Sequence, residues 1–320
     1  MSISQKQEHQ HVTTQIDSGQ KAKADGKENN KTSGLWLLVL AGSLWGAGGL
    51  TGTLLAQHTG LTSPAIGAYR LAVGGLLLVL VVLLTGRSIP RTRPQITRVV
   101  LIGLLAAEFQ ACYFAAVSTI SVSLGTLITI GASPVLVLAA ESAMGRRRAD
   151  RRALATVGLA IVGLTLLIGV PSSGRNLTTM LAGAGFALLA AAGFATMTVI
   201  GSRSVAGLDE MASTGFGFTL GALVLAPIAA AGGGLTFTPT TGALSLLLLL
   251  GAGPTAMAYA AYFRGLRDAQ AGTAALMALL EPLVGTVLSV LILGDRLGPA
   301  GIVGAALLLT ALVIEGSKKG

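Results

Sequence analysis

The 320-residue chain is poor in charge: only 11% of its residues are Asp, Glu, Lys or Arg, while 52% carry apolar side chains. Soluble domains carry about 25% charged residues, so this composition excludes a soluble globular protein and indicates an integral membrane protein. Cys112 is the single cysteine, which excludes an intramolecular disulfide. The three histidines form neither an H-E-x-x-H motif nor a Cys/His cluster, so we expect no metal site and no cofactor.

Two kinds of catalytic motif are also missing. The chain has no G-x-x-x-x-G-K-[ST] sequence, so it does not drive itself with ATP. No Ser/His/Asp set can be assembled within the apolar segments, and we therefore expect no enzymatic activity. These absences favour a protein that moves or organises molecules in the bilayer.

Ten apolar stretches are long enough to cross about 30 Å of hydrocarbon. They lie near residues 35–56, 65–84, 97–117, 122–144, 153–170, 178–200, 211–231, 241–263, 271–293 and 298–315. The sequence thus predicts an all-α integral membrane protein with ten transmembrane helices.

Landmark residues recur at a spacing close to 147. Examples are Gly46 and Gly193, Gly74 and Gly221, Gly103 and Gly251, and Pro134 and Pro282. Each copy holds five spans, and because five is odd the second copy must enter the membrane from the opposite side. We predict two inverted five-helix repeats, 34–171 and 178–316, after a disordered tail of residues 1–33. Inverted repeats recur in secondary transporters, where the halves rock around a midplane site.

The net charge of +9 follows the predicted topology. The tails and alternate connections hold 19 of the 22 Lys and Arg residues, whereas the other face holds only Arg175 and Arg296. By the positive-inside rule both termini are cytoplasmic. The basic balance is therefore an orientation signal, with some attraction to anionic lipid, and we expect no nucleic-acid partner.

Three charged residues lie well inside predicted spans: Arg70, Glu108 and Glu281. A charge at mid-span costs about 2.5–3.5 kcal/mol on insertion scales, and such groups usually face a bundle interior or a wet cavity. The glutamates are candidates for substrate binding or a proton relay, and a structural ion pair or hydrogen-bonded network is the alternative. For Arg70 a structural pair or snorkelling is the favoured interpretation. Trp45 and Tyr259 lie deep enough to line a pocket.

The ninth span carries a semi-polar stripe at a spacing of four: Thr273, Met277, Glu281, Gly285 and Ser289. The fourth span carries the matching stripe: Gly125, Thr129, Ser133, Val137 and Glu141. The two stripes predict facing walls of a cavity, with Ser133 and Glu281 as substrate contacts. We expect spans one, three, four, six, eight and nine to surround it.

Prolines break the spans at matching points of the two repeats. Pro134 and Pro282 each remove a backbone hydrogen bond, so we assign them a structural or gating role together with Arg70. The ring of Pro282 should also free a carbonyl one turn earlier, which would offer a second polar contact beside Glu281.

These residues resemble the EamA family of the drug/metabolite transporter superfamily over roughly residues 34–316. The most specific part is the end of the second repeat, Ala275 to Leu283, Leu293 to Leu297, Gly301 and Gly304. Ser133-Pro134-Val135, Gly145-Arg146, Leu44-Trp45-Gly46 and Arg70 match more weakly. One departure is Thr53, where many members of the family carry a lysine.

The resemblance implies a ten-span exporter of amino acids, related metabolites or drugs. We therefore expect a secondary active transporter in a bacterial inner membrane, exporting a small amphiphilic metabolite such as an amino acid, with protons as the candidate coupling ion. Multidrug efflux and a non-transporting scaffold or flippase component are the alternatives. Expected partners are the small-molecule substrate and the lipid bilayer, and the expected state is a monomer or homodimer.

The charge asymmetry predicts which loops face outward. In a Cys112→Ala background, single cysteines at Ser63 and Thr238 should react with an impermeant thiol reagent added to intact cells. Cysteines at Asp150 and Ser317 should be protected until the membrane is permeabilised. Labelling of the cysteine at Asp150 in intact cells would show the orientation to be wrong.

Overall fold

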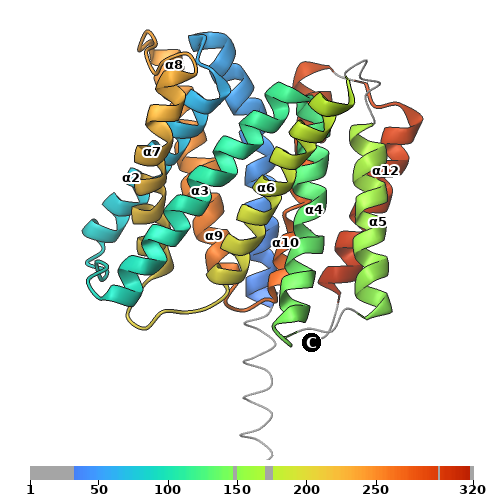
Figure 1. Cartoon of the computed structure of the whole chain (residues 1–320), viewed down its shortest axis with the longest axis horizontal. Helices are drawn as coiled ribbons and strands as arrows, with labels where there is room; N and C mark the ends of the chain where they lie inside the picture. The colour runs from blue at the N-terminus through green and yellow to red at the C-terminus, as the bar shows by residue number, and fades with distance from the viewer. Residues whose placement is uncertain (1–31, 147–149, 170–175, 295, 318–320) are drawn as a thin grey trace, which may run out of the picture.

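The computed structural model describes residues 32–146, 150–169, 176–294 and 296–317, and over these residues the protein is a helical bundle without strands (Figure 1). The ten predicted spans are confirmed, because ten helices of the described chain are long and apolar enough to cross a membrane. Seven of the spans after the first are single helices: α2 (Ser63–Leu84), α3 (Arg93–Thr119), α4 (Val122–Ala143), α5 (Arg151–Ile168), α6 (Leu177–Gly201), α7 (Glu210–Ala231) and α12 (Pro299–Gly316). The first span is the helix Thr32–Thr59. Thus Thr32 and Ser33, placed in the predicted tail, are already helical, and the rest of that tail lies outside the described residues.

The two remaining spans are composite. The eighth consists of α8 (Thr241–Leu250), the π-helical turn η1 (Gly251–Met257) and α9 (Ala258–Gly265). The ninth consists of α10 (Ala271–Met277), α11 (Leu280–Leu288) and the π-helical turn η2 (Ser289–Leu293). Pro254 lies within η1, and Pro282 lies in the first turn of α11. Both interruptions thus coincide with a proline, which removes a backbone donor. A proline alone does not interrupt a span, because α4 continues as an α-helix through Pro134, where a break was expected, and α7 continues through Pro227.

Short polar side chains define where the helices begin. Ser121, Asp150, Asn176, Asp209 and Thr240 each accept a hydrogen bond from a backbone N–H two or three residues further on, at the first turns of α4 to α8. Such caps satisfy donors that have no partner inside the helix. These caps therefore fix the starts of α4 to α8 close to the predicted ends of the membrane spans.

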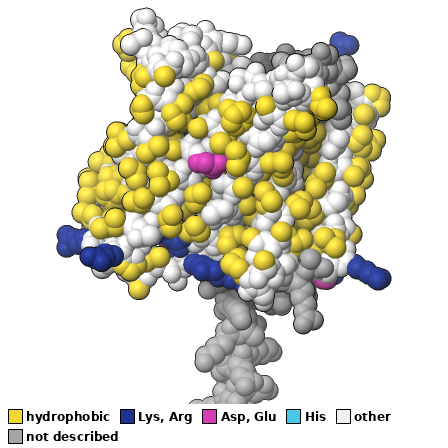
Figure 2. Space-filling view, viewed as in Figure 1, with side chains coloured by type: hydrophobic (Ala, Val, Ile, Leu, Met, Phe, Trp, Pro, Cys, Tyr) yellow, Lys and Arg dark blue, Asp and Glu magenta, His cyan; other side chains and the backbone are white. Residues whose placement is uncertain are grey.

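Because the number of spans is even, both ends of the described chain lie at the same end of the bundle, which we call the terminal face; the opposite end is the distal face (Figure 1). Figure 2 shows arginine side chains along the terminal face, below a broad apolar surface. The arrangement agrees with the charge asymmetry of the sequence.

The two halves of the chain interlock instead of lying side by side. Helix α6, the first of the second half, packs against α3 and α4 of the first half. In the opposite sense, the helix Thr32–Thr59 packs against the ninth span, where Gly42 meets Met277 and Leu280. At the centre α2 packs along α7, its counterpart in the other half. This reciprocal packing is the arrangement that inverted repeats generate.

Glycines allow the central helices to cross at backbone distance. A side chain at Gly74 of α2 would collide with Thr255 and the Gly251 carbonyl of the eighth span. At the equivalent crossing in the other half, Gly103 of α3 and Gly221 of α7 are packed so closely that a methyl group on either would meet the backbone of the other helix. Without a hydrophobic driving force between helices, such close packing is a main source of association in lipid.

Helices α5 and α12 form a separate pair at one edge of the bundle (Figure 1). A side chain at Gly163 would meet the Gly304 carbonyl, and a side chain at Gly304 would meet the Gly163 carbonyl. The pair therefore lies outside the ring of helices that surrounds the centre.

The crossing at Gly103 predicts a stability effect that can be measured. Gly103→Val should lower the melting temperature of the detergent-solubilised protein, because overpacking costs about 1–3 kcal/mol. Gly185→Val is the matched control, since nothing lies within 4 Å of a methyl group added at Gly185 of α6. Equal melting temperatures for the two variants would contradict the close crossing.

Candidate functional site

A cavity of about 510 Å³ occupies the distal half of the bundle. Its lining comes from spans one, two, three, four, six, eight and nine. The predicted set of walls thus lacked one member, the second span, which contributes Ser63, Ile66 and Arg70. Ligand cavities in proteins commonly measure about 300–1,000 Å³, so this one can hold a small metabolite.

Aromatic rings form much of the cavity wall and its floor. The floor is a cluster of Trp45, Phe194, Tyr259 and Tyr262, in which the centroid of the Trp45 ring lies 4.9 Å from those of Tyr259 and Tyr262 and 5.9 Å from that of Phe194. The hydroxyl groups of Tyr262 and Thr198 are hydrogen-bonded at 2.8 Å. Below the floor the side chains of Leu38, Met277 and neighbouring residues are buried. The floor therefore closes the cavity toward the terminal face.

Glu281 enters the cavity from the start of α11, half-buried, and Gly285 and Ser289 follow it along the same wall. The distal part of the predicted stripe thus lines the cavity, whereas Met277 is buried in the core. The expected free carbonyl before Pro282 is not present: the Ala278 carbonyl accepts a 3.0 Å hydrogen bond from the Glu281 N–H. A tighter local turn has replaced the bond that proline removed.

Arg70 is the only cation among the residues that line the cavity. Its Nε donates to the Thr255 hydroxyl at 3.3 Å, and its charge interacts electrostatically with that of Glu281. The side chain thus lines the cavity instead of snorkelling outward, while its hydrogen bond to Thr255 agrees with the other expectation, a structural pair. Thr53, at the position where many family members carry lysine, also lines the cavity and bonds the Gly49 carbonyl through its hydroxyl at 2.9 Å.

Two predicted substrate contacts, Glu108 and Ser133, are not among the lining residues. The Glu108 carboxylate lies against α6 at Gly193, where any side chain would overlap it, and Oε2 is buried without a hydrogen-bond partner in the described chain. Ser133 is buried and donates to the Thr129 carbonyl of its own helix at 2.7 Å. The stripe on the fourth span therefore faces the packed interior, and the expectation that it forms a cavity wall is wrong.

The terminal end of the ninth span is held by two buried glutamates. Glu141 of α4 accepts a 3.1 Å hydrogen bond from the Gly272 N–H, and Glu315 of α12 accepts one of 2.8 Å from the Thr273 hydroxyl. These acids therefore tie α10 to both neighbouring helices.

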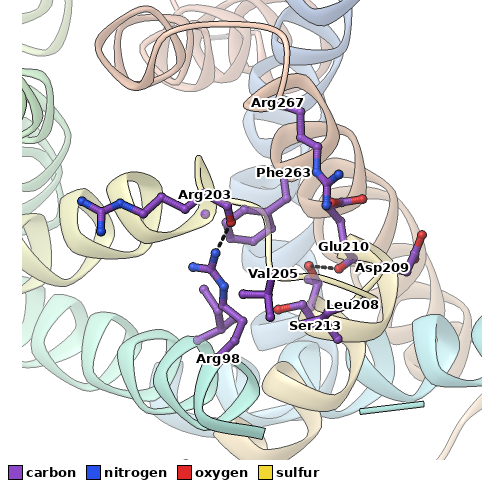
Figure 3. A pocket seen from close by; sticks show the side chains of 12 residues that line it. Arg98, Arg203, Val205, Leu208, Asp209, Glu210, Ser213, Phe263 and Arg267 are labelled. Carbon is purple, nitrogen blue, oxygen red and sulfur yellow. Dashed lines mark hydrogen bonds and ion pairs between the residues drawn. The ribbon is translucent and has the colours of Figure 1, made fainter. Parts of the chain in front are cut away.

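A second, much smaller hollow of about 20 Å³ lies at the terminal face, between α3, α7 and the connection before α7 (Figure 3). Arg98 is buried there and donates to the carbonyls of Ile200 and Arg203, while Arg267 pairs with Glu210. A hollow of this size holds about one water molecule. The hydrogen bonds of Arg98 tie the end of α6 to α3. The hollow itself is too small to bind a metabolite.

Ten spans in two interlocked halves, arranged around a cavity that is open toward one face and closed toward the other, define a membrane transporter. A family comparison supports this class: residues 32–169 and 181–315 match the model of the EamA-like transporter family. The chain belongs to the EamA-like transporter family, within the drug/metabolite transporter superfamily.

Two curated proteins are similar along almost their whole length. The uncharacterized transporter YwfM of Bacillus subtilis (strain 168) is 29% identical over 278 residues, which cover 87% of this chain and 91% of that protein. The uncharacterized inner membrane transporter YicL of Salmonella typhimurium (strain LT2) is 23% identical over 291 residues, covering 88% and 94% of the two chains. Both names describe transporters without a stated substrate.

A solved crystal structure shares the fold, with a TM-score of 0.75 over 88% of this chain and 97% of the other. At 17% identity, the similarity shows the architecture alone.

The position of the cavity predicts a difference in reactivity along the ninth span. In a Cys112→Ala background, a cysteine at Ser289 should react quickly with a water-soluble methanethiosulfonate, because Ser289 lines the cavity. A cysteine at Met277, which lies three turns earlier and is only 2% exposed, should react at least about tenfold more slowly, because local opening must precede its reaction. Equal rates would show that the floor does not close the cavity.

Proposed function

We propose that the protein is a secondary transporter that exports a zwitterionic amphiphilic metabolite, an amino acid with a large apolar side chain, across a bacterial plasma membrane. The observation that carries the proposal is a single cavity lined by one cation, one carboxyl group and a wall of aromatic rings. The family assigns transport, and the chemistry of the cavity suggests the class of solute.

The two charged side chains suit the two ends of a zwitterion. A guanidinium binds carboxylates through paired, charge-assisted hydrogen bonds, which suits Arg70 to a substrate carboxylate. The Glu281 carboxylate suits an ammonium group. Ionisable residues within membrane spans are costly, and their default interpretation is functional. A substrate that pairs with both would lower that cost while bound.

The aromatic rings suit an apolar substrate side chain. Trp45, Phe109, Tyr113, Phe114 and Tyr259 contribute lining surface to the same cavity. Burial of apolar surface contributes roughly 25 cal/mol per Å², so a large side chain would add more affinity than a small one. Aromatic faces also attract ammonium groups, which complements Glu281.

Orientation and coupling complete the proposal. If the terminal face is cytoplasmic, as the positive charges suggest, the cavity is open to the outside and the aromatic floor closes the inside. Alternating access then requires the floor to open and the distal half to close. Exchange of a proton for the substrate ammonium at Glu281 would couple export to the proton gradient. One chain contains the entire cavity, so the proposal requires only a monomer.

Multidrug efflux is the second candidate, because the aromatic wall and Glu281 would also suit a lipophilic cation. Arg70 opposes it, since a second positive charge in the same low-dielectric space would be repelled. A scaffold role would leave the cavity without a purpose.

Transport by the purified protein in proteoliposomes tests the proposal. Arg70→Gln should lower the rate of L-phenylalanine exchange about 10- to 100-fold, because a charge-assisted hydrogen bond contributes about 1.5–3 kcal/mol. Arg296→Gln, which alters an exposed arginine outside the cavity, is the control. Faster transport of tetraphenylphosphonium by Arg70→Gln than by the wild type, with no amino acid transported by either, would favour drug efflux.

In the same assay, Glu281→Gln keeps the size and hydrogen bonding of the side chain but cannot titrate. We expect its residual transport to be independent of pH. If Glu281→Gln kept both the wild-type rate and the wild-type pH dependence, Glu281 would not be the coupling group.

A further inference from the structure

We propose that Thr255 is a positioning residue that aims the guanidinium group of Arg70 into the cavity and so makes the site selective for a carboxylate. The inference rests on the proposed function of Arg70 as the group that binds a substrate carboxylate. Thr255 itself does not contact the substrate, because it is fully buried and is not part of the cavity lining.

The Thr255 hydroxyl has a single possible orientation in the structure. Its proton is donated to the Leu250 carbonyl at 2.9 Å, five residues earlier in the eighth span. The lone pairs of Oγ1 are therefore directed away from that carbonyl, and one of them accepts the hydrogen bond from Arg70 Nε at 3.3 Å. A hydroxyl oriented by one partner is a pre-organised acceptor for the other.

This hydrogen bond engages Nε and leaves the two terminal nitrogens of the guanidinium group for the cavity. Among the described residues, neither terminal nitrogen of Arg70 has a hydrogen-bond partner. Those two nitrogens form the edge that pairs with both oxygens of a carboxylate. The bond to Thr255 thus determines which edge of Arg70 a substrate meets.

The backbone geometry is built around this pair. Gly74, one turn after Arg70, allows α2 to approach so closely that an added methyl group would overlap the Thr255 methyl group. On the other side, Thr255 lies within the π-helical turn η1, whose widened register replaces a regular α-helical turn. Such turns are found frequently at functional sites.

The equivalent crossing in the other half shows that close packing alone does not require the pair. At the repeat spacing of that region, Arg70 corresponds to Gly217 and Thr255 corresponds to Ala107. That crossing keeps its glycines, Gly103 and Gly221, and α3 is a continuous α-helix there. The arginine and its acceptor are therefore additions to a shared packing motif, made in one half only.

The test compares substrates with and without a carboxylate in proteoliposomes. Wild-type protein should prefer L-phenylalanine to 2-phenylethylamine. Thr255→Val should weaken the apparent affinity for phenylalanine about tenfold and leave that for phenylethylamine unchanged, because only the aim of the guanidinium is lost. Thr255→Ser, which keeps the hydroxyl, should retain the wild-type ratio within about twofold. Adding Arg70→Gln to Thr255→Val should cost no more than Arg70→Gln alone, because coupled residues are not additive.

Thr219→Val is the matched control. Thr219 also packs against a glycine of α2, Gly75, but its hydroxyl donates to the Gly215 carbonyl of its own helix at 2.8 Å. We expect no change in the substrate ratio for this variant. A Thr255→Val protein that lost both substrates equally, or a Thr255→Ser protein that behaved like Thr255→Val, would overturn the proposal in favour of a packing role.

A second measurement does not depend on the substrate. Phenylglyoxal reacts with the terminal nitrogens of arginine, and mass spectrometry gives the rate of modification at Arg70 relative to the exposed Arg296. We expect Thr255→Val to slow the Arg70 reaction at least about threefold, as the guanidinium turns from the cavity. A slower reaction in a protein that transports no amino acid would keep the positioning role and reject the substrate class. An unchanged rate would reject the positioning role, whatever the protein transports.

Discussion

Close backbone crossing at glycine is the constraint on which the architecture depends. In lipid the apolar side chains of two helices gain little by leaving their surroundings, so helices associate through tight packing and through polar contacts that only near approach allows. The crossings of α2 with η1 and of α3 with α7 supply the tight packing, and the first of them also supplies a polar contact. They hold the centre of the bundle together, and at Gly74 the same approach brings an arginine to its acceptor. Packing and site chemistry thus share one geometric requirement.

The number, order and inversion of the spans could be predicted because long apolar runs and an odd repeat leave few alternatives. Their internal structure could not. Pro134 and Pro282 predicted breaks, but the sequence does not say whether a helix will continue through its proline, as α4 does, or split, as between α10 and α11. That choice depends on which neighbours satisfy the displaced carbonyl, and the Glu281 N–H does so for Ala278.

The site was predictable in part for a related reason. A helix that is apolar on all sides has no periodic signal that fixes its rotation about its axis. Depth along the span can be read from the sequence, and it placed Trp45, Tyr259 and Glu281 at the right level for the cavity. The rotation of a helix about its axis cannot be read in this way. Glu108 and Ser133, at comparable depths, were expected in the cavity but face other helices, whereas Arg70 faces the cavity. The position of Arg70 near the end of its span was therefore not enough to predict that its side chain points away from the cavity.

The break in the ninth span divides one transmembrane segment into parts with separate constraints. The part before the break, α10, is tied at its terminal end to Glu141 and Glu315, while the part after it, α11, forms the cavity wall. In a continuous helix, a bulky substitution in the wall would push on the whole rod through its unbroken hydrogen-bond ladder. Here the ladder is interrupted near Ala278, so such a shift is absorbed at the break. The residues after Glu281 can therefore vary in size while the tie at the other end keeps its geometry.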